Sequence, residues 1–334
     1  MTGSLLDVRE LSVTFESSAG PVNAVNGVSF DVARGEAVAI VGESGSGKSV
    51  TALSILGLLP GGQRSSGEIR FDGRDLRTLG ERDLQRVRGS QIALIPQDPM
   101  TSLNPVLSVG RQLGLAIRRH SRMTRAAARD RAAELLDLVG LPNASRRLSD
   151  YPHQFSGGQR QRILIALAVS SDPALLVADE PTTALDVTVQ AQIIELVGRL
   201  REQLGTAVVW ITHDLGVVAG MVDRVVVMYA GRVVESGPTA AVFADPGHPY
   251  TAGLLRSLPP HDGPRRPLVP ITGSPPDLLH LSQGCSFAPR CPFAVDACRA
   301  AVPAAVELAP GHAAACIRTL ERRAVVADQT GGTT

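Results

Sequence analysis

Lysine is almost absent from this sequence. Of the 33 Lys and Arg residues, 32 are arginine and a single one, Lys48, is lysine. Arginine is a planar fork suited to bidentate contacts, whereas lysine carries a compact ammonium group on a flexible stem. Because every other such position is arginine, the single lysine indicates that a compact point charge is needed at position 48.

Aromatic residues and long apolar runs are also scarce. Aromatics make up 3% of the 334 residues, so the core has to be built from Ala, Val, Leu and Ile. The most apolar stretch, residues 163–169, ends at Ser-Ser-Asp-Pro, whereas a membrane span needs about 18 apolar residues. The first ten residues include acids where a secretory signal has a basic start. We expect a cytoplasmic chain whose membrane role, if any, comes through a partner.

Charge and cysteine exclude further classes. The formal net charge of +1 gives no electrostatic case for nucleic-acid binding. Cysteine is missing from the first 284 residues, and the four cysteines follow a C-x5-C-x6-C-x17-C pattern that differs from the paired CxxC of a zinc ribbon. In a cytosolic chain such clustering indicates metal binding rather than disulfides. A 4Fe–4S cluster, a zinc ion and four reduced thiols all remain open at this point.

The single lysine lies in the sequence GESGSGKS, which matches the phosphate-loop pattern G-x-x-x-x-G-K-[ST] at every position. Residues 37–41 predict a buried strand before the loop and residues 50–59 a helix after it, which is the order that a phosphate site requires. The sequence therefore predicts a nucleotide-binding protein. The residues predicted to contact ATP here are Gly42, Glu43, Ser44, Gly45, Ser46, Gly47, Lys48 and Ser49.

A second apolar segment, residues 174–178, ends in the adjacent acids Asp179 and Glu180. Open α/β sheets bind ligands at the carboxyl ends of their strands. Asp179 is therefore predicted to hold Mg²⁺ together with Ser49, and Glu180 to act as general base toward the attacking water. The alternative is a pair of inert acids at a strand end, which the phosphate loop upstream disfavours.

The segment FSGGQRQR, residues 155–162, resembles the LSGGQ signature of ATP-binding-cassette (ABC) ATPases, with Phe155 in place of the usual leucine. A hydroxyl and unhindered backbone N–H groups at the start of a helix favour an anion. The resemblance covers about residues 5–240, and it implies that each signature closes over the ATP of a second cassette. The signature residues assigned to this role are Ser156, Gly157, Gly158 and Gln159.

Further family motifs match residue by residue. Gln97 resembles the Q-loop glutamine, Asp186 the D-loop aspartate and His213 the switch histidine that contacts the γ-phosphate. Phe15 fits the aromatic that stacks on adenine, although a role in the core or at a strand edge is nearly as well supported. The resemblance thus implies catalytic roles for Lys48, Glu180 and His213, and Mg²⁺ ligation by Ser49, Gln97 and Asp179.

The resemblance also implies a fold class and a domain plan. The expected fold is α/β: a P-loop ABC ATPase core with a RecA-like sheet, an antiparallel β subdomain and a helical signature subdomain. We predict a nucleotide-binding domain over residues 1–240, with the helical subdomain at about 98–170. A C-terminal extension over 241–323 would contain a small cysteine module, and residues 324–334 would form a disordered tail.

Residues 41–60, 97–110 and 179–193 look like the ATP-binding subunits of dipeptide and oligopeptide importers, and residues 181–193 resemble the first (D-type) of their two ATPases. The sequence GHPYTAGLL at 247–255 resembles the start of their C-terminal region, and the cysteine segment continues the likeness. Related subunits carry a 4Fe–4S cluster there, so the resemblance favours a cluster over zinc or free thiols. Its ligands would be Cys285, Cys291, Cys298 and Cys316.

The function implied is an ATPase that binds ATP and Mg²⁺ and powers import of di- and oligopeptides, peripherally at the cytoplasmic face of the cell membrane. Its expected partners are a second ABC ATPase subunit (a paralogue rather than a copy), two transmembrane permease subunits and an extracytoplasmic solute-binding protein, without nucleic acid. Nickel or another small solute remains open as cargo. A non-transport ABC ATPase would need coiled coils or a second cassette, and a P-loop kinase or GTPase would lack the signature.

Overall fold

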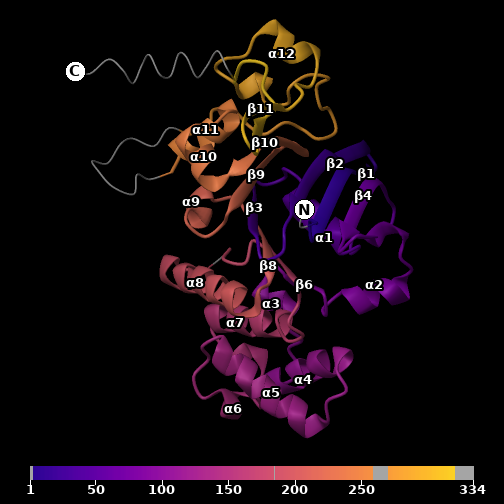
Figure 1. Ribbon diagram of the computed structural model, residues 1–334, viewed down its shortest axis with the longest axis vertical. Helices are drawn as coiled ribbons and strands as arrows, with labels where there is room; N and C mark the ends of the chain where they lie inside the picture. Colours follow the sequence, from indigo (N-terminus) through magenta and orange to yellow (C-terminus); the bar gives the residue numbers. More distant parts are fainter. Residues whose placement is uncertain (1–2, 184, 259–269, 320–334) are drawn as a thin grey trace, which may run out of the picture.

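The computed structural model describes residues 3–183, 185–258 and 270–319 (Figure 1). Within them two β-sheets and a set of helices form the P-loop architecture that the sequence predicts. The helical part containing α4–α7 lies at one end of the molecule and the C-terminal part containing α12 at the other. None of the helices in these ranges has the length and apolar character that crossing a membrane would require.

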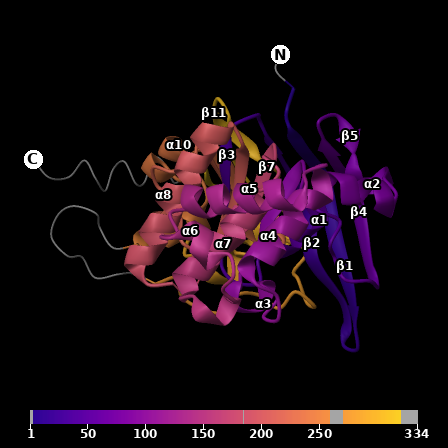
Figure 2. The ribbon, with the colours of Figure 1, turned by 90° about the horizontal axis from the view of Figure 1, so that it is seen from below.

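The smaller sheet is antiparallel and has the strand order β2-β1-β4-β5. Its long strands alternate buried and exposed positions, because only one face packs against the core. Figure 2 shows this sheet on the side of the molecule that carries α1 and α2. Its strands are β1 (Leu6–Ser17), β2 (Gly20–Val32), β4 (Gln63–Phe71) and β5 (Arg74–Asp75).

The larger sheet has the order β11-β12-β10-β9-β3-β8-β7-β6, and its central strands run parallel. Three of those strands are buried at every position, as expected for strands covered on both faces. The parallel strands are β3 (Ala37–Val41), β6 (Ile92–Ile95), β7 (Leu175–Asp179), β8 (Ala207–Thr212) and β9 (Arg224–Tyr229).

The helices fall into three groups. Beside the sheets lie α1 (Lys48–Ile55), α2 (Glu81–Val87), α8 (Val187–Leu204) and α9 (Leu215–Val218). The helical subdomain contains α3 (Pro99–Ser102), α4 (Val109–His120), α5 (Arg125–Leu138), α6 (Ala144–Arg147) and α7 (Gly157–Ala168). The C-terminal part contains α10 (Thr239–Ala244), α11 (Pro249–Arg256) and α12 (Asp296–Ala300).

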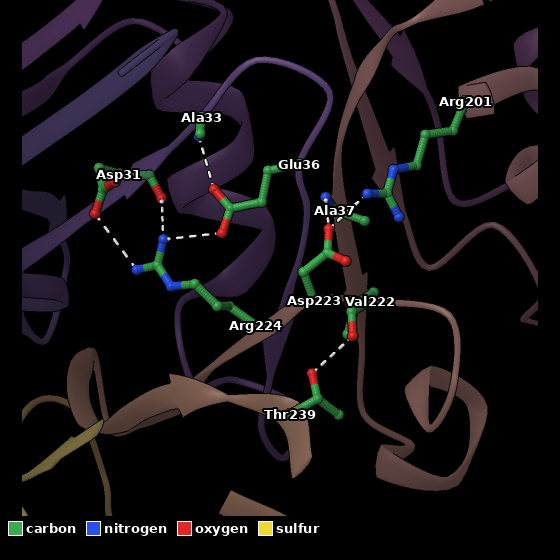
Figure 3. Close-up of polar contacts among 9 residues, drawn as sticks. All are labelled: Asp31, Ala33, Glu36, Ala37, Arg201, Val222, Asp223, Arg224 and Thr239. Carbon is green, nitrogen blue, oxygen red and sulfur yellow. Dashed lines mark hydrogen bonds and ion pairs between the residues drawn. The ribbon is translucent and has the colours of Figure 1, made fainter. Parts of the chain in front are cut away.

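A polar network fixes the amino end of β3, opposite to the phosphate loop (Figure 3). The Asp223 carboxylate accepts hydrogen bonds from the Ala37 backbone N–H at 2.8 Å and from Arg201 of α8 at 2.6 Å. The Arg224 guanidinium donates to Glu36 at 3.1 Å. These contacts join the starts of β3 and β9 to α8, so the strand that leads into the loop is held at its far end.

The C-terminal residues extend the main sheet instead of folding apart from it. Strand β12 (His312–Ala314) pairs antiparallel with β10 (Arg232–Pro238), and β11 (Val306–Ala309) pairs with β12. The buried Glu235 carboxylate of β10 lies 2.7 Å from Nε2 of His312 and accepts the backbone N–H groups of Gly247 and His248. The domain boundary at residue 240 remains a prediction, since strand pairing crosses it. The expected tail, 324–334, lies outside the described residues.

Candidate nucleotide-binding site

The phosphate loop follows β3 directly and ends where α1 begins. Gly47 precedes the helix with a φ of 98°, which a residue with a side chain rarely adopts. A Cβ at Gly42 would lie 2.2 Å from the carbonyl oxygen of Met228, and one at Gly47 would lie 2.4 Å from that of Ala24. The loop therefore keeps its shape because glycine is the residue that fits at both ends.

Lys48 is 4% exposed and is held within its own loop. Its Nζ donates hydrogen bonds to the carbonyl oxygens of Gly42 at 2.8 Å and Glu43 at 2.9 Å, and it lies 3.9 Å from Oε1 of Glu180. Burial lowers the pKa of the ammonium group, and the carboxylates of Glu180 and Asp179 oppose that shift. The ammonium is thus poised at the start of α1, where backbone N–H groups also favour an anion.

Two features show that the loop fits a phosphate group. Ser46 is 3% exposed, and its hydroxyl has no hydrogen-bond partner among the described residues. Buried polar atoms are normally paired, so an unpartnered hydroxyl in the same loop as Lys48 indicates a place for an outside acceptor. Gly45 also has a positive φ, of 78°. Apart from Gly45 itself and its chain neighbours, no atom of the described residues lies within 4 Å of the place where its Cβ would be, so the loop is open on that side.

The two groups predicted to hold Mg²⁺ are in contact. The Ser49 hydroxyl donates to Oδ1 of Asp179 at 2.9 Å, joining the first turn of α1 to the end of β7. Burial raises the pKa of Asp179; the Ser49 hydrogen bond opposes the shift, and the neighbouring Glu180 charge adds to it. A hydroxyl and a carboxylate oxygen side by side are the ligand types that Mg²⁺ prefers.

Glu180 lies at the centre of the candidate site. Its Oε2 accepts hydrogen bonds from Gln97 Nε2 at 3.1 Å and from the Thr183 hydroxyl at 2.9 Å, and lies 3.3 Å from Nδ1 of His213. Its backbone has a φ of 44°, a left-handed conformation rare for a residue with a side chain. The structure thus brings together Lys48, Gln97, Asp179, Glu180 and His213. Thr183 was not singled out from the sequence. The signal that could have identified it is its place in the PTTALD stretch, three residues after Glu180.

The signature segment forms the start of α7, in the helical subdomain (Figure 1). Ser156 is the N-cap of α7: its hydroxyl accepts the Gln159 backbone N–H at 3.3 Å, and the Gln159 side chain accepts the Ser156 N–H at 3.2 Å. Ser156 and Gly157 are exposed, whereas Phe155 is buried under the guanidinium of Arg147, 4.2 Å from its ring centroid. The segment therefore offers an exposed, capped helix start.

Two further predicted residues have local roles. Asp186 caps α8, where its carboxylate accepts the Val189 N–H at 2.9 Å. Phe15 lies in β1, half-buried against the core cluster that contains Val13 and Val25. The packing of Phe15 is compatible with either of the two roles that the sequence left open, so adenine stacking stays a prediction.

The four cysteines line one pocket, together with His248 and Phe287. The backbone N–H of Cys285 donates to the carbonyl of Cys298 at 2.8 Å, and burial raises the pKa of the Cys285 thiol. Among the described residues, however, no three or more His, Cys, Asp or Glu side chains form a group that could hold a metal ion. The predicted cysteine module and its cluster are therefore not supported by a formed metal site.

A contact that sequence reasoning missed joins the C-terminal part to the phosphate loop. Arg290 donates from Nη1 to Oε2 of Glu43 at 2.7 Å and from Nη2 to Oε1 at 3.0 Å. The Tyr250 hydroxyl accepts the backbone N–H of Glu43 at 2.8 Å. These residues are separated by more than 200 positions in the chain, and no spacing or motif in the sequence marks the contact.

Two family models match the chain: ABC transporter over residues 25–183, and oligopeptide/dipeptide transporter, C-terminal region, over residues 234–298. The chain is 53% identical over 320 residues to a probable peptide ABC transporter ATP-binding protein of Sinorhizobium fredii, covering 95% of this chain and 96% of that one. It is 49% identical to the oligopeptide transport ATP-binding protein OppD of Escherichia coli, covering 95% and 94%.

Solved structures resemble the ATPase part. A dimeric ATP-binding cassette in a post-hydrolysis state, bound to ADP and Pi, matches with a TM-score of 0.63 and 30% identity over 70% of this chain and 98% of that one. The cbiO1 subunit of an ABC transporter complex from Clostridium perfringens matches with a TM-score of 0.62 and 30% identity, covering 72% and 91%.

Proposed function

This chain belongs to the ATP-binding proteins of ABC transporters, and on that premise we propose that it hydrolyses ATP to power the import of dipeptides or oligopeptides. The observation that carries the proposal is the convergence on Glu180 of Lys48, Gln97 and His213 beside the Ser49–Asp179 contact. The relatives named for peptide transport cover almost the whole chain, including the C-terminal region.

We assign the following roles in hydrolysis. Lys48 and the loop N–H groups bind the β- and γ-phosphates, while Ser49, Asp179 and Gln97 hold Mg²⁺, which would neutralise phosphate charge. Glu180 orients the attacking water and accepts its proton, with Thr183 and Gln97 fixing the carboxylate. His213 lies where it can stabilise charge on the transferred phosphate.

The second half of the site comes from another subunit. The exposed Ser156–Gly157 end of α7 supplies N–H groups and a hydroxyl to the γ-phosphate bound on the facing cassette, and Asp186 lies at that same interface. Residues 1–240 would form this ATPase domain, with residues 241–323 as its extension. We favour a paralogue as the partner because residues 181–193 resemble the D-type subunit of importers that carry two different ATPases. Two permease subunits and a solute-binding protein would complete the importer, with this chain on the cytoplasmic face.

A transport assay tests the proposal. The chain is co-purified with its permease and partner ATPase subunits, reconstituted in proteoliposomes and supplied with the solute-binding protein. We expect ATP-dependent uptake of radiolabelled di- or tripeptides, abolished in Glu180→Gln. Uptake of nickel without peptide uptake would overturn the assignment of cargo. Absence of Mg²⁺-dependent ATP hydrolysis in the assembled complex would overturn the function itself.

We also propose that the four cysteines bind a 4Fe–4S cluster. In its support, four thiols, that of Cys298 on α12 among them, line one pocket, and four cysteine thiolates are the usual ligand set of such a cluster. Protein purified without oxygen should show broad visible absorbance and about four irons per chain, both lost in Cys298→Ser. Colourless protein, or protein with one zinc per chain, would overturn this assignment.

A further inference from the structure

The C-terminal part of the chain contacts the phosphate loop through a partly buried ion pair. Arg290 is 6% exposed in its side chain and binds both carboxylate oxygens of Glu43, which is 25% exposed. Bidentate arginine–carboxylate pairs fix orientation as well as distance, and a partly buried pair is screened less by solvent than a surface pair. Among the described residues, this ion pair joins a residue after position 240, Arg290, to the phosphate loop.

Arg290 is itself held from several directions. Its Nε donates to the carbonyl of Thr272 at 3.0 Å, and its Nη1 lies 3.3 Å from the Tyr229 hydroxyl. The ring of Tyr229 packs against those of Tyr250 and Phe287 at centroid distances of 4.6 and 5.3 Å. The guanidinium is therefore a fixed group of the C-terminal part, so its position constrains Glu43.

From Glu43 the contacts continue to the catalytic lysine. The carboxylate of Glu43 is bound by Arg290, its N–H donates to Tyr250, and its carbonyl accepts from Lys48 Nζ at 2.9 Å. Every polar group of this loop residue is thus engaged, two of them by the C-terminal part and one by Lys48. A change in how Arg290 holds Glu43 would move the carbonyl on which Lys48 rests.

We propose that Arg290 is a positioning residue for ATP binding: through Glu43 it preorganises the phosphate loop and Lys48, and so places ATP affinity under the control of the C-terminal part of the chain. The proposal deepens the ATPase function proposed above and rests on it for the ligand. Preorganisation acts on binding more than on chemistry, because the arginine touches neither nucleotide nor water.

The experiment compares Arg290→Met, Glu43→Gln and the double variant, with Arg299→Met as control, since Arg299 forms an exposed pair with Asp296 in the same part of the chain. Equilibrium binding of Mg²⁺-ATP should weaken by about tenfold in each single variant, and in Arg290→Met kcat at saturating ATP should stay within about twofold. The double variant should be no weaker than the singles, because both remove one interaction. Arg290→Lys should restore part of the affinity, and Arg299→Met should match the parent.

Glu43→Gln leaves the cysteine segment untouched, so it separates loop positioning from any damage to the neighbouring pocket. Unchanged ATP affinity in Glu43→Gln would overturn the proposal, as would equal losses in Arg299→Met. Amide hydrogen exchange of residues 42–49 in nucleotide-free protein supplies a readout that needs no ATP: it should be about tenfold faster in both single variants. If amide exchange of residues 42–49 is unchanged in the variants, the inference is overturned even when hydrolysis is normal. If exchange is faster but the protein binds no ATP, only the proposed function is overturned.

Discussion

The phosphate loop and the signature segment are built in opposite ways. Lys48 is buried, bonded to two carbonyls of its own loop and 3.9 Å from the carboxylate of Glu180, which follows β7. Ser156 and Gly157 are exposed at the start of α7, where Ser156 bonds within the first turn, to Gln159 in the capping box and to the Arg160 N–H. One segment is held by contacts within the chain, while the other presents a capped helix start to the solvent.

This contrast is what a shared site requires. The half that holds the nucleotide has to be preorganised before ATP arrives, so its groups are fixed by internal contacts. The half that closes over the nucleotide has to remain accessible until two subunits meet. Substitutions in the first half should therefore affect the isolated subunit, whereas substitutions in the second should act only when two cassettes are present.

The largest effect is expected for Glu180→Gln, in the buried half. Glutamine keeps the size of the side chain and its contacts to Gln97 and Thr183 but cannot take up a proton. Hydrolysis should fall by at least about 100-fold while Mg²⁺-ATP binding stays within about twofold. Phosphate release and equilibrium binding measure the two. The control is Glu195→Gln, at an exposed pair with Arg199 on α8, and near-normal hydrolysis in Glu180→Gln would contradict the assigned base.

A smaller loss is expected for Gly157→Ala, in the exposed half. A Cβ there would meet only Leu185, at an ordinary 3.7 Å, so the fold should tolerate it. It would nevertheless crowd the N–H groups offered to the facing nucleotide, so hydrolysis by the assembled complex should fall by roughly tenfold. ATP binding to the isolated subunit should not change.

Gly158→Ala provides the matched contrast, because its Cβ would lie 2.6 Å from Val189. That overlap should lower the free energy of unfolding by about 1–3 kcal/mol, seen as a lower Tm. Weaker ATP binding by the isolated Gly157→Ala subunit would break the distinction between the two halves.

A pH-dependent effect is expected at Asp179. Its pKa is raised in the folded protein by burial, so the unliganded fold loses stability as pH rises from the usual aspartate range through the raised pKa. Asp179→Asn removes this contribution and keeps an oxygen for Ser49. The nucleotide-free variant should have the higher Tm at neutral pH, and the difference should vanish in acid. A Tm difference that is independent of pH would contradict the role of burial.

The smallest effect is expected for Phe155→Leu, which restores the residue usual in the signature. The change removes the contact of the ring with the Arg147 guanidinium, 4.2 Å from its centroid. The loss should be about 1 kcal/mol of unfolding free energy, with hydrolysis within about twofold. Thermal unfolding of the variant measures the loss, and Phe30→Leu, at another buried ring, serves as a control for ring removal alone.

The sequence predicts the parallel sheet, and it predicts which side chains the loop half brings together, because they follow a buried strand directly or after the phosphate loop. The segments 37–41 and 174–178 are continuous apolar runs, and the groups after them, Lys48, Asp179 and Glu180, are brought together by the geometry of a parallel sheet. His213 follows β8 in the same way. Periodicity and motif spacing are local signals, and here the local signals determine the site.

The C-terminal part could not be predicted in the same way. The Arg290–Glu43 pair joins residues 247 positions apart, and neither residue belongs to a pattern that specifies the other. Strands β11 and β12 are short and partly exposed, so no apolar pattern marks them; β12 pairs with β10 beside the buried Glu235–His312 contact, and β11 pairs with β12. Such contacts are decided by tertiary packing, which spacing along the chain does not encode.

The burial of the single lysine has a consequence for chemical labelling. Reagents that acylate amines have one side-chain target in this protein, besides the amino terminus. That target is 4% exposed and hydrogen-bonded to two carbonyls, so its reaction requires the phosphate loop to open. The rate at which Lys48 is acylated therefore reports loop opening at one known atom, in a chain where no other lysine obscures the signal.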